Sequence, residues 1–542
     1  MGRQPRTTLM ALCLPLAAVL IPVLTLASAC SSPEEYSRQA DAEVLPMLDE
    51  TQQQVLGDRE ARMEHPEPVA QDEPAADDAA EPDVQLPEPE HVDLARALET
   101  AFSTSREFLD RQEQLYLQGL GLSLTRYDFG PILDATIALV WQDAEDSQST
   151  TTAGALLGVS QIMPSGGTLG LVGSMDATTI GGEPFPGLDD PSYDNSAVFT
   201  LNQPLMRGFG YEVSHEALTQ AERDLVYEVR DFELFREDFS ISIADDFFDL
   251  VSRRQQLEVL EQTYQDSVFD QHKAEALRQV DRNKDEDVFL ARRRAIDIEN
   301  QLLTAQADYL EAVDRFKLRL GLPVDVPVVI DEHDPPYEPV SVDADSAVRV
   351  ALHNRLDLQN ATERLEDDER RIRVAADALR PQLDLGLIGG VADNDDSLSG
   401  ALADDWSSTA ALTLGLPLNR QAERNAYRSA QIAYDRSQRD YETLLDDVDR
   451  DVRNLLRQIR TTELQIELQR EQILQEQRAV AVSQIRYEAG DVDNRDLLDA
   501  RASLALAQND LIRLLADHLT TRLRLMRSMG VLVIGPDGSW SP

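Results

Sequence analysis

The chain has 542 residues, of which 99 are acidic and 50 are basic, and its formal net charge is −49. This length supports several hundred residues of packed structure, which excludes a peptide and a single small domain. The excess of acidic residues argues against nucleic acid as a partner, because phosphate backbones bind basic surfaces.

The first thirty residues have the pattern of a secretory signal that ends in a cysteine. Two arginines precede an apolar stretch at 9–26, and small residues stand directly before Cys30. We predict that residues 1–29 are a lipoprotein signal peptide and that Cys30 is the lipid attachment site. Two alternatives stay open, namely an ordinary cleavage site beside an incidental cysteine and a membrane-spanning anchor.

Cleavage before Cys30 would change the charge and the cysteine content of the mature chain. Two arginines and Cys13 leave with the signal, so 48 basic residues face 99 acidic ones and the formal charge becomes −51. One remaining cysteine permits neither a disulfide framework nor a cysteine-based metal site within one chain. No later stretch approaches the roughly 18 apolar residues of a spanning helix, so we expect any membrane crossing to use strands.

Residues 30–90 change in composition to Pro, Ala, Glu and Asp, and six of the prolines would interrupt a helix: Pro66, Pro68, Pro74, Pro82, Pro87 and Pro89. Such a composition does not bury enough apolar surface to fold. We predict an acidic, disordered tether between the lipid and the folded body.

From residue 91 onward the chain repeats one plan of helix, strands, long helix, turn and helix. Shifts of 250, 213 and 209 residues superpose three pairs of segments, namely 97–101 on 347–351, 199–207 on 412–420 and 291–321 on 500–530. We predict a first repeat at 91–330, a second repeat at 331–532 and a C-terminal tail at 533–542.

The two copies differ in the length of their strand regions. In the first copy Pro131 and Pro204 are 73 residues apart, whereas the matching prolines of the second copy are 36 apart. The 37 extra residues include 158–161 and 166–174, which predict a further hairpin. We therefore leave the number of strands open.

The helical parts are long and keep a seven-residue repeat of apolar positions. A helix at 421–489 would be about 100 Å long at 1.5 Å per residue. Its predicted seam consists of Val448, Val452, Leu455, Ile459, Thr462, Ile466, Gln469 and Ile473. This spacing predicts coiled-coil packing, and a plain antiparallel coiled coil would show the same pattern.

The strand segments alternate apolar residues with small or polar ones. The apolar positions are Ile137, Leu139, Trp141, Leu383, Leu385, Leu387, Leu412, Leu414 and Leu416. Strands of about ten residues with one apolar face are typical of a membrane barrel with a water-filled interior. A soluble sandwich alternates similarly, but the lipid signal and the two helical hairpins favour the barrel.

Acidic residues gather between the strands, and the seven histidines are scattered. The acidic loops could bind divalent cations outside the cell, although none has a calcium-loop spacing, and solvated loops are the alternative. No H-E-x-x-H, G-x-S-x-G or phosphate-loop pattern occurs, and His215-Glu216 has no second histidine four residues after His215. We predict no catalytic residue, no metal site, no cofactor and no enzymatic activity.

Three segments are informative together, namely Leu94–Leu98, the strand-to-helix signature Leu201–Gly208 and the run Arg486–Ala500. With these segments the sequence resembles, over residues 94–531, the TolC-like outer membrane efflux protein family. Within the signature and its second copy, the matched positions are Pro204, Arg207, Pro417 and Arg420.

The resemblance implies an α+β membrane protein and a homotrimer. Long coiled-coil hairpins from the tandem repeat would form a trimeric α-barrel in the periplasm, and the strands would contribute to a transmembrane β-barrel in outer-membrane lipid. The implied function is the exit duct of a tripartite efflux or type I secretion system, with a periplasmic adaptor and an inner-membrane pump as partners. The alternative is a non-conducting structural or adaptor-like envelope lipoprotein, although adaptors carry one helical hairpin rather than two.

The turns between the long helices are the predicted periplasmic tips, where an adaptor would dock or a gate would close. The tip residues are Asp281, Arg282, Asn283 and Asp285 in the first copy and Gly490, Asp491, Asp493 and Arg495 in the second. The first tip lacks a glycine, but an asparagine tolerates the left-handed conformation of a turn. Gly490 could also do no more than end its helix.

Overall fold

The computed structural model describes residues 32–57, 90–144, 147–180, 192–279, 285–331, 337–395, 405–489 and 494–541. The chain divides into two compact units, and each is treated by itself. The sheet unit takes its described residues from Met1–Thr51, Tyr116–Glu228 and Ala361–Arg439, and the hairpin unit takes its own from Gln52–Leu115, Val229–Asn360 and Asp440–Pro542.

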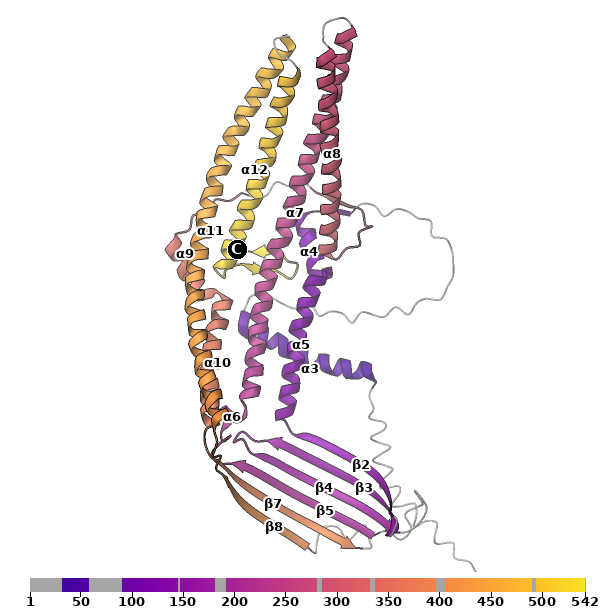
Figure 1. Ribbon diagram of the computed structural model, residues 1–542, viewed down its shortest axis with the longest axis vertical. Helices are drawn as coiled ribbons and strands as arrows, with labels where there is room; N and C mark the ends of the chain where they lie inside the picture. Colours follow the sequence, from indigo (N-terminus) through magenta and orange to yellow (C-terminus); the bar gives the residue numbers. More distant parts are fainter. Residues whose placement is uncertain are drawn as a thin grey trace, which may run out of the picture. The chain divides into compact units, whose positions relative to one another are not determined.

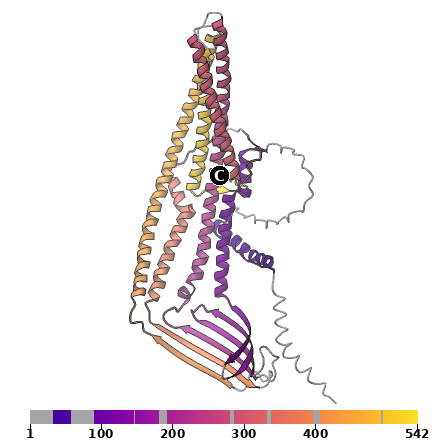
Figure 2. The ribbon, with the colours of Figure 1, turned by 45° about the vertical axis from the view of Figure 1, so that its right-hand side comes forward.

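The sheet unit contains one antiparallel sheet of six strands, shown from two sides in Figures 1 and 2. The strands are β2 (Ile132–Ala144), β3 (Ser147–Ile162), β4 (Thr168–Ile180), β5 (Ser192–Pro204), β7 (Gln382–Asp395) and β8 (Asp405–Gly415). Their order in the sheet is β2-β3-β4-β5-β7-β8. The further hairpin expected within the 37 extra residues is confirmed as β3 and β4.

Helical segments of the sheet unit come from α3 (Pro33–Leu56), α5 (Arg106–Phe129), α6 (Tyr211–Ser214), α7 (Glu216–Gln279), α10 (Leu356–Asp377) and α11 (Gln421–Ala489). The expected helix at 421–489 is confirmed at both ends. Helix α7 has 64 residues and contains neither glycine nor proline, which explains its unbroken course.

The prediction of a disordered tether is wrong for residues 33–56, which form α3. Val44 and Leu48 are buried, and a Cβ on Gly119 of α5 would lie only 2.7 Å from Val44 Cγ1. The Tyr116 hydroxyl donates a hydrogen bond to Asp41 Oδ1 at 2.5 Å. The six prolines expected to interrupt a helix all follow residue 65. The average composition of residues 30–90 therefore conceals a helix with an apolar side in the first part of this segment. Residues 58–89 lie outside the described residues.

The hairpin unit is built mainly from helices. It includes parts of α5, α7, α10 and α11, together with α4 (Leu94–Thr104), α8 (Asp285–Leu320), α9 (Ala344–Asn354) and α12 (Asn494–Ser528). Short strand pairs accompany them, β1 (Glu90–Val92) parallel to β6 (Val328–Ile330) and β9 (Val533–Ile534) antiparallel to β10 (Trp540–Ser541).

The predicted seam of α11 largely holds in the hairpin unit. Val448, Val452 and Ile459 are almost fully buried, in a core that also takes Ala347 and Ala351 from α9. Thr462 and Ile466 continue the buried row. At one point the seam shifts by one residue, with Leu456 buried and Leu455 only partly so, because 3.6 residues per turn drift against a seven-residue repeat.

The C-terminal tail is folded against helix α7. Ser240 donates a hydrogen bond to Gly538 O at 2.9 Å, and Arg236 donates to Ile534 O and Gly535 O at 3.1 and 3.0 Å. Gly538 has a φ of +77°, and a Cβ there would press against the Phe102 ring. The tail therefore completes the core of the hairpin unit.

Candidate functional site

One face of the six-stranded sheet carries most of its large apolar side chains, with a few polar residues such as Asn195 and Ser408 among them. Register places Leu133 beside Val159, Val159 beside Leu171, and Leu171 beside Phe199. The same face carries Ile137, Leu139, Trp141, Leu157, Leu169, Met175, Leu201, Leu383, Leu385, Leu387, Val391, Trp406, Leu412 and Leu414. Leu133 is 73% exposed and Trp406 is 76% exposed, so this face needs an apolar surrounding.

The opposite face is mostly small or polar. It carries Thr136, Ala138, Thr152, Gly154, Gly158, Gly170, Ser174, Ser196, Thr200, Gly386, Gly390, Ser407, Thr409 and Thr413, with scattered apolar residues Val140, Leu156, Val172, Val198 and Ile388. The alternation expected for the segments around Ile137, Leu385 and Leu414 is therefore confirmed in β2, β7 and β8, and β3, β4 and β5 show it as well. An apolar outer face and a polar inner face are typical of a membrane barrel that encloses water.

The polar face carries negative charge and no positive charge. The six strand sequences hold eight aspartates and neither lysine nor arginine. The side chains of Asp134, Asp176, Asp194 and Asp384 are described, and all four lie on the polar face. A Cβ at Gly158 would come within 2.5 Å of Asp134 Oδ1, so this glycine gives the carboxylate its space.

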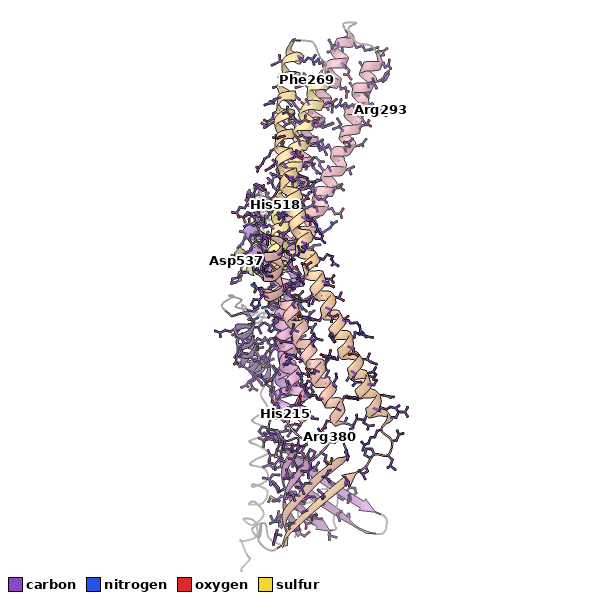
Figure 3. All side chains as sticks on the ribbon, turned by 90° about the vertical axis from the view of Figure 1, so that its left-hand side faces the viewer. His215, Phe269, Arg293, Arg380, His518 and Asp537 are labelled. Carbon is purple, nitrogen blue, oxygen red and sulfur yellow. The ribbon has the colours of Figure 1, made fainter. Side chains whose placement is uncertain are left out.

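The strand-to-helix signature forms the junction between β5 and α7. Pro204 ends β5, and two glycines with positive φ, Gly208 at +81° and Gly210 at +102°, turn the chain toward the helix. Gly208 N donates a hydrogen bond to Asp377 Oδ2 at 2.6 Å, which ties the turn to the end of α10. At this junction His215 is buried, with ring centroids of Tyr211 and Phe129 at 4.5 and 4.8 Å, and Figure 3 marks its place.

The matching arginines of the two copies make different contacts at their junctions. Arg207 lies 3.9 Å from Glu423, a carboxylate of the second copy. Arg420 instead donates to two backbone carbonyls of its own copy, those of Pro417 and Leu379. The four signature positions thus hold the strand-to-helix connections, and none of these contacts involves reactive chemistry.

A buried polar network joins the first part of α7 to α10. Arg370 donates to Glu216 Oε2, Asp367 Oδ1 and Gln220 Oε1 at 2.5, 2.9 and 3.1 Å. Asp367 also accepts a hydrogen bond from the Tyr227 hydroxyl at 2.6 Å. Burial and this hydrogen bond raise the pKa of Tyr227. These residues were not predicted, because each alone looks like a solvated side chain of a helix.

Most predicted tip residues, and Cys30, lie outside the described residues: Asp281, Arg282, Asn283, Gly490, Asp491 and Asp493. Asp285 begins α8 and forms an ion pair with Arg278. Of Arg495 only the backbone is described, in α12. Of the acidic loops, Glu145, Asp146, Asp189, Asp190, Asp396 and Asp404 also lie outside the described residues, so cation binding there stays an open expectation.

No helix within the described ranges is both long and apolar enough to cross a membrane. The chain combines a tandem repeat, two long helical hairpins and a sheet with one apolar and one polar face. This combination defines an α+β fold of long helical hairpins and one antiparallel sheet.

Comparison with known proteins supports this class. Residues 347–531 match the family described as "Outer membrane efflux protein", and no curated protein sequence matches the chain. The fold is similar to VceC of Vibrio cholerae, with 16% identity, a TM-score of 0.58 and coverage of 81% of this chain and 96% of VceC. It is also similar to CmeC of Campylobacter jejuni, with 14% identity, a TM-score of 0.59 and coverage of 81% and 85%.

A third similar structure is MtrE of Neisseria gonorrhoeae in its open state, with 15% identity, a TM-score of 0.54 and coverage of 81% and 89%. The resemblance to the TolC-like outer membrane efflux protein family is therefore confirmed, by sequence over much of the second repeat and by fold over most of the chain.

Proposed function

We propose that the chain is an outer-membrane channel, the exit duct of a tripartite efflux or type I secretion system. CmeC and MtrE are outer membrane channels by description. Strands from three copies would close one barrel in the outer membrane, and the long helices would form a tunnel in the periplasm. A periplasmic adaptor and an inner-membrane pump would deliver the cargo, and this chain would make or break no bond.

The observation that carries the proposal is the two-faced sheet. Its apolar face spans all six strands and suits lipid, whereas its polar face suits water. A non-conducting coiled-coil lipoprotein, the alternative function, would have no need of such a sheet. Cys30, two residues before the first described residue, would add a lipid anchor to the same membrane.

The test is conductance of the purified full-length protein in planar lipid bilayers. We expect discrete single-channel steps and a trimer that dissociates only on heating, as closed barrels resist detergent. A preparation that is trimeric and membrane-inserted but never conducts would favour the non-conducting alternative. Cross-linking to an adaptor in whole cells would test the tripartite assembly separately.

A further inference from the structure

The insertion in the first copy is a complete pair of strands. β2 begins directly after Pro131 and β5 ends at Pro204, as β7 follows Pro381 and β8 precedes Pro417 in the second copy. β2 and β5 are therefore the counterparts of β7 and β8. In the described part of the second copy β3 and β4 have no counterpart, and without them the chain would supply four strands to the sheet.

The inserted strands are full members of the sheet. β2 pairs with β3 from Ile132↔Ser160 to Gln142↔Thr150, and β3 pairs with β4 without a register shift. β4 then pairs with β5, so that β2 and β5 are separated by two strands. The apolar and polar faces continue through both inserted strands.

The turn of the inserted hairpin is fixed to the strand-to-helix junction. Gly210 N donates a hydrogen bond to Ser165 O at 3.0 Å, and Gln203 Nε2 donates to the same oxygen at 3.1 Å. Gly166 has a φ of +86°, and a Cβ there would overlap Gly208 O. These contacts hold the hairpin in the sheet rather than leaving it as a movable flap.

Among the described residues, the outer strands β2 and β8 have a strand partner on one side only. β2 has 13 residues and β8 has 11, and a long apolar edge of this kind aggregates unless it is paired. β2 leads away from α5 and β8 leads toward α11, so the two edges run in opposite directions. A second copy of this chain can therefore continue the antiparallel order, β8 beside β2, with the apolar faces on one side.

We propose that the inserted hairpin widens the pore of the closed sheet by about half, because barrel diameter grows roughly linearly with strand number and each copy supplies six strands instead of four. The proposal rests on the channel function above, but the ratio does not depend on how many copies close the barrel. Three copies give eighteen strands, in the range where barrels hold an open aqueous channel.

Several inner positions of the inserted strands are small, so that carboxylates and hydroxyls of neighbouring strands lie over them. Gly154, Gly158, Gly170 and Ser174 lie on the polar face, and small residues do not fill a barrel as bulky ones do. The wide, acidic lumen suits large hydrated cargo, such as polar polymers, better than small apolar solutes.

The experiment compares the full-length channel with a variant that lacks Ser147–Ile180, the whole of β3 and β4. Graded polyethylene glycols are added on the side of the strand loops, and the largest polymer that lowers conductance is recorded. The full-length channel should admit polymers about half again as large in radius. If both channels conduct and the same largest polymer lowers the conductance of each, the proposed widening is wrong but the channel function stands. If neither the full-length protein nor the variant conducts, the proposed function itself is wrong.

A cysteine test in the full-length chain keeps the proposal falsifiable if the deletion variant does not fold. The mature chain would have Cys30 as its sole cysteine, and that cysteine would be acylated. Disulfides between engineered cysteines would therefore form without competition from a native thiol. Ala135→Cys with Leu157→Cys, a register pair of β2 and β3, should cross-link within one chain. Ala135→Cys with Ala197→Cys, on β2 and β5, should not, since three strand spacings of about 4.8 Å separate them. Cross-linking of the second pair would show that the hairpin lies outside the sheet.

Discussion

Two adjacent residues of β7 test the assignment of the sheet faces. Leu387 lies on the apolar face between Leu201 and Ala410, and Ile388 lies on the polar face between Thr200 and Thr409. Both are aliphatic and of similar size, and β7 is an inner strand with neighbours on both sides. Replacing each with lysine is therefore the same chemical change on opposite faces.

Leu387→Lys should destabilise the membrane-inserted state by about 2–4 kcal/mol, the cost of a lysine near the middle of the lipid face. Since each 1.4 kcal/mol is a factor of ten, the folding equilibrium should fall by roughly 30-fold to several hundred-fold. Ile388→Lys should change the stability little, because Ile388 is 50% exposed and the ammonium of the new lysine would lie in water.

The measurement is urea-driven unfolding of the two variants and the parent protein from phospholipid vesicles, with heat-modified gel mobility as a second readout. Ile388→Lys should also shift the reversal potential toward anions, since it adds positive charge to an acidic lumen. Equal losses for the two variants, or a larger loss for Ile388→Lys, would refute the assignment of the faces.

Four further predictions follow from the chain. Cys30→Ala should abolish acyl labelling but leave barrel assembly intact, and unchanged labelling would exclude Cys30 as the attachment site. The pore should prefer cations in a salt gradient, and Asp176→Asn should weaken this preference; an anion-selective parent channel would contradict the role of the acidic face. Asp491→Lys with Asp493→Lys should weaken export and adaptor cross-linking, or make the isolated channel leak, with normal trimer stability; wild-type behaviour in all three assays would make the tip a passive turn. Burial and the hydrogen bond to Asp41 raise the pKa of Tyr116 to about 12, so the neutral phenol stabilises the docked α3, and this stabilisation should be lost as pH rises from the ordinary tyrosine range of about 10 through 12; Tyr116→Phe should remove that pH dependence of α3 protection in hydrogen exchange.

Much of the fold could be predicted because its signals are local or repeated. Alternation in strands and the seven-residue spacing in α11 depend on neighbours within a few residues. The inserted hairpin was visible because the second copy supplied an internal reference for the first. Without the duplication, residues 158–174 would have been one more glycine-rich stretch of a strand region.

The polar network of α7 and α10 could not be predicted in the same way. Glu216 and Arg370 are separated by 154 residues and meet only because two helices pack side by side. In sequence, an arginine on a charged helix is normally solvated, and nothing local distinguishes one that is buried. The helix α3 was missed for a different reason, since an average over a long acidic stretch conceals Val44 and Leu48.

The two junctions show how the insertion and the strand-to-helix signature depend on each other. At a shift of 213 residues, Gly208 and Gly210 of the first copy fall on Gln421 and Glu423 of the second, so the glycines occur only where the extra hairpin does. In the structure Gly208 O faces Gly166, and Gly210 N binds Ser165, both in the turn of that hairpin. The described part of the second copy contains no such turn, and the chain enters α11 at Gln421 instead. Side chains at Gly208 and Gly210 would oppose the positive-φ backbone conformation that brings the junction and the turn of the hairpin together. Contact with the inserted hairpin therefore explains why the first junction has glycines at these positions.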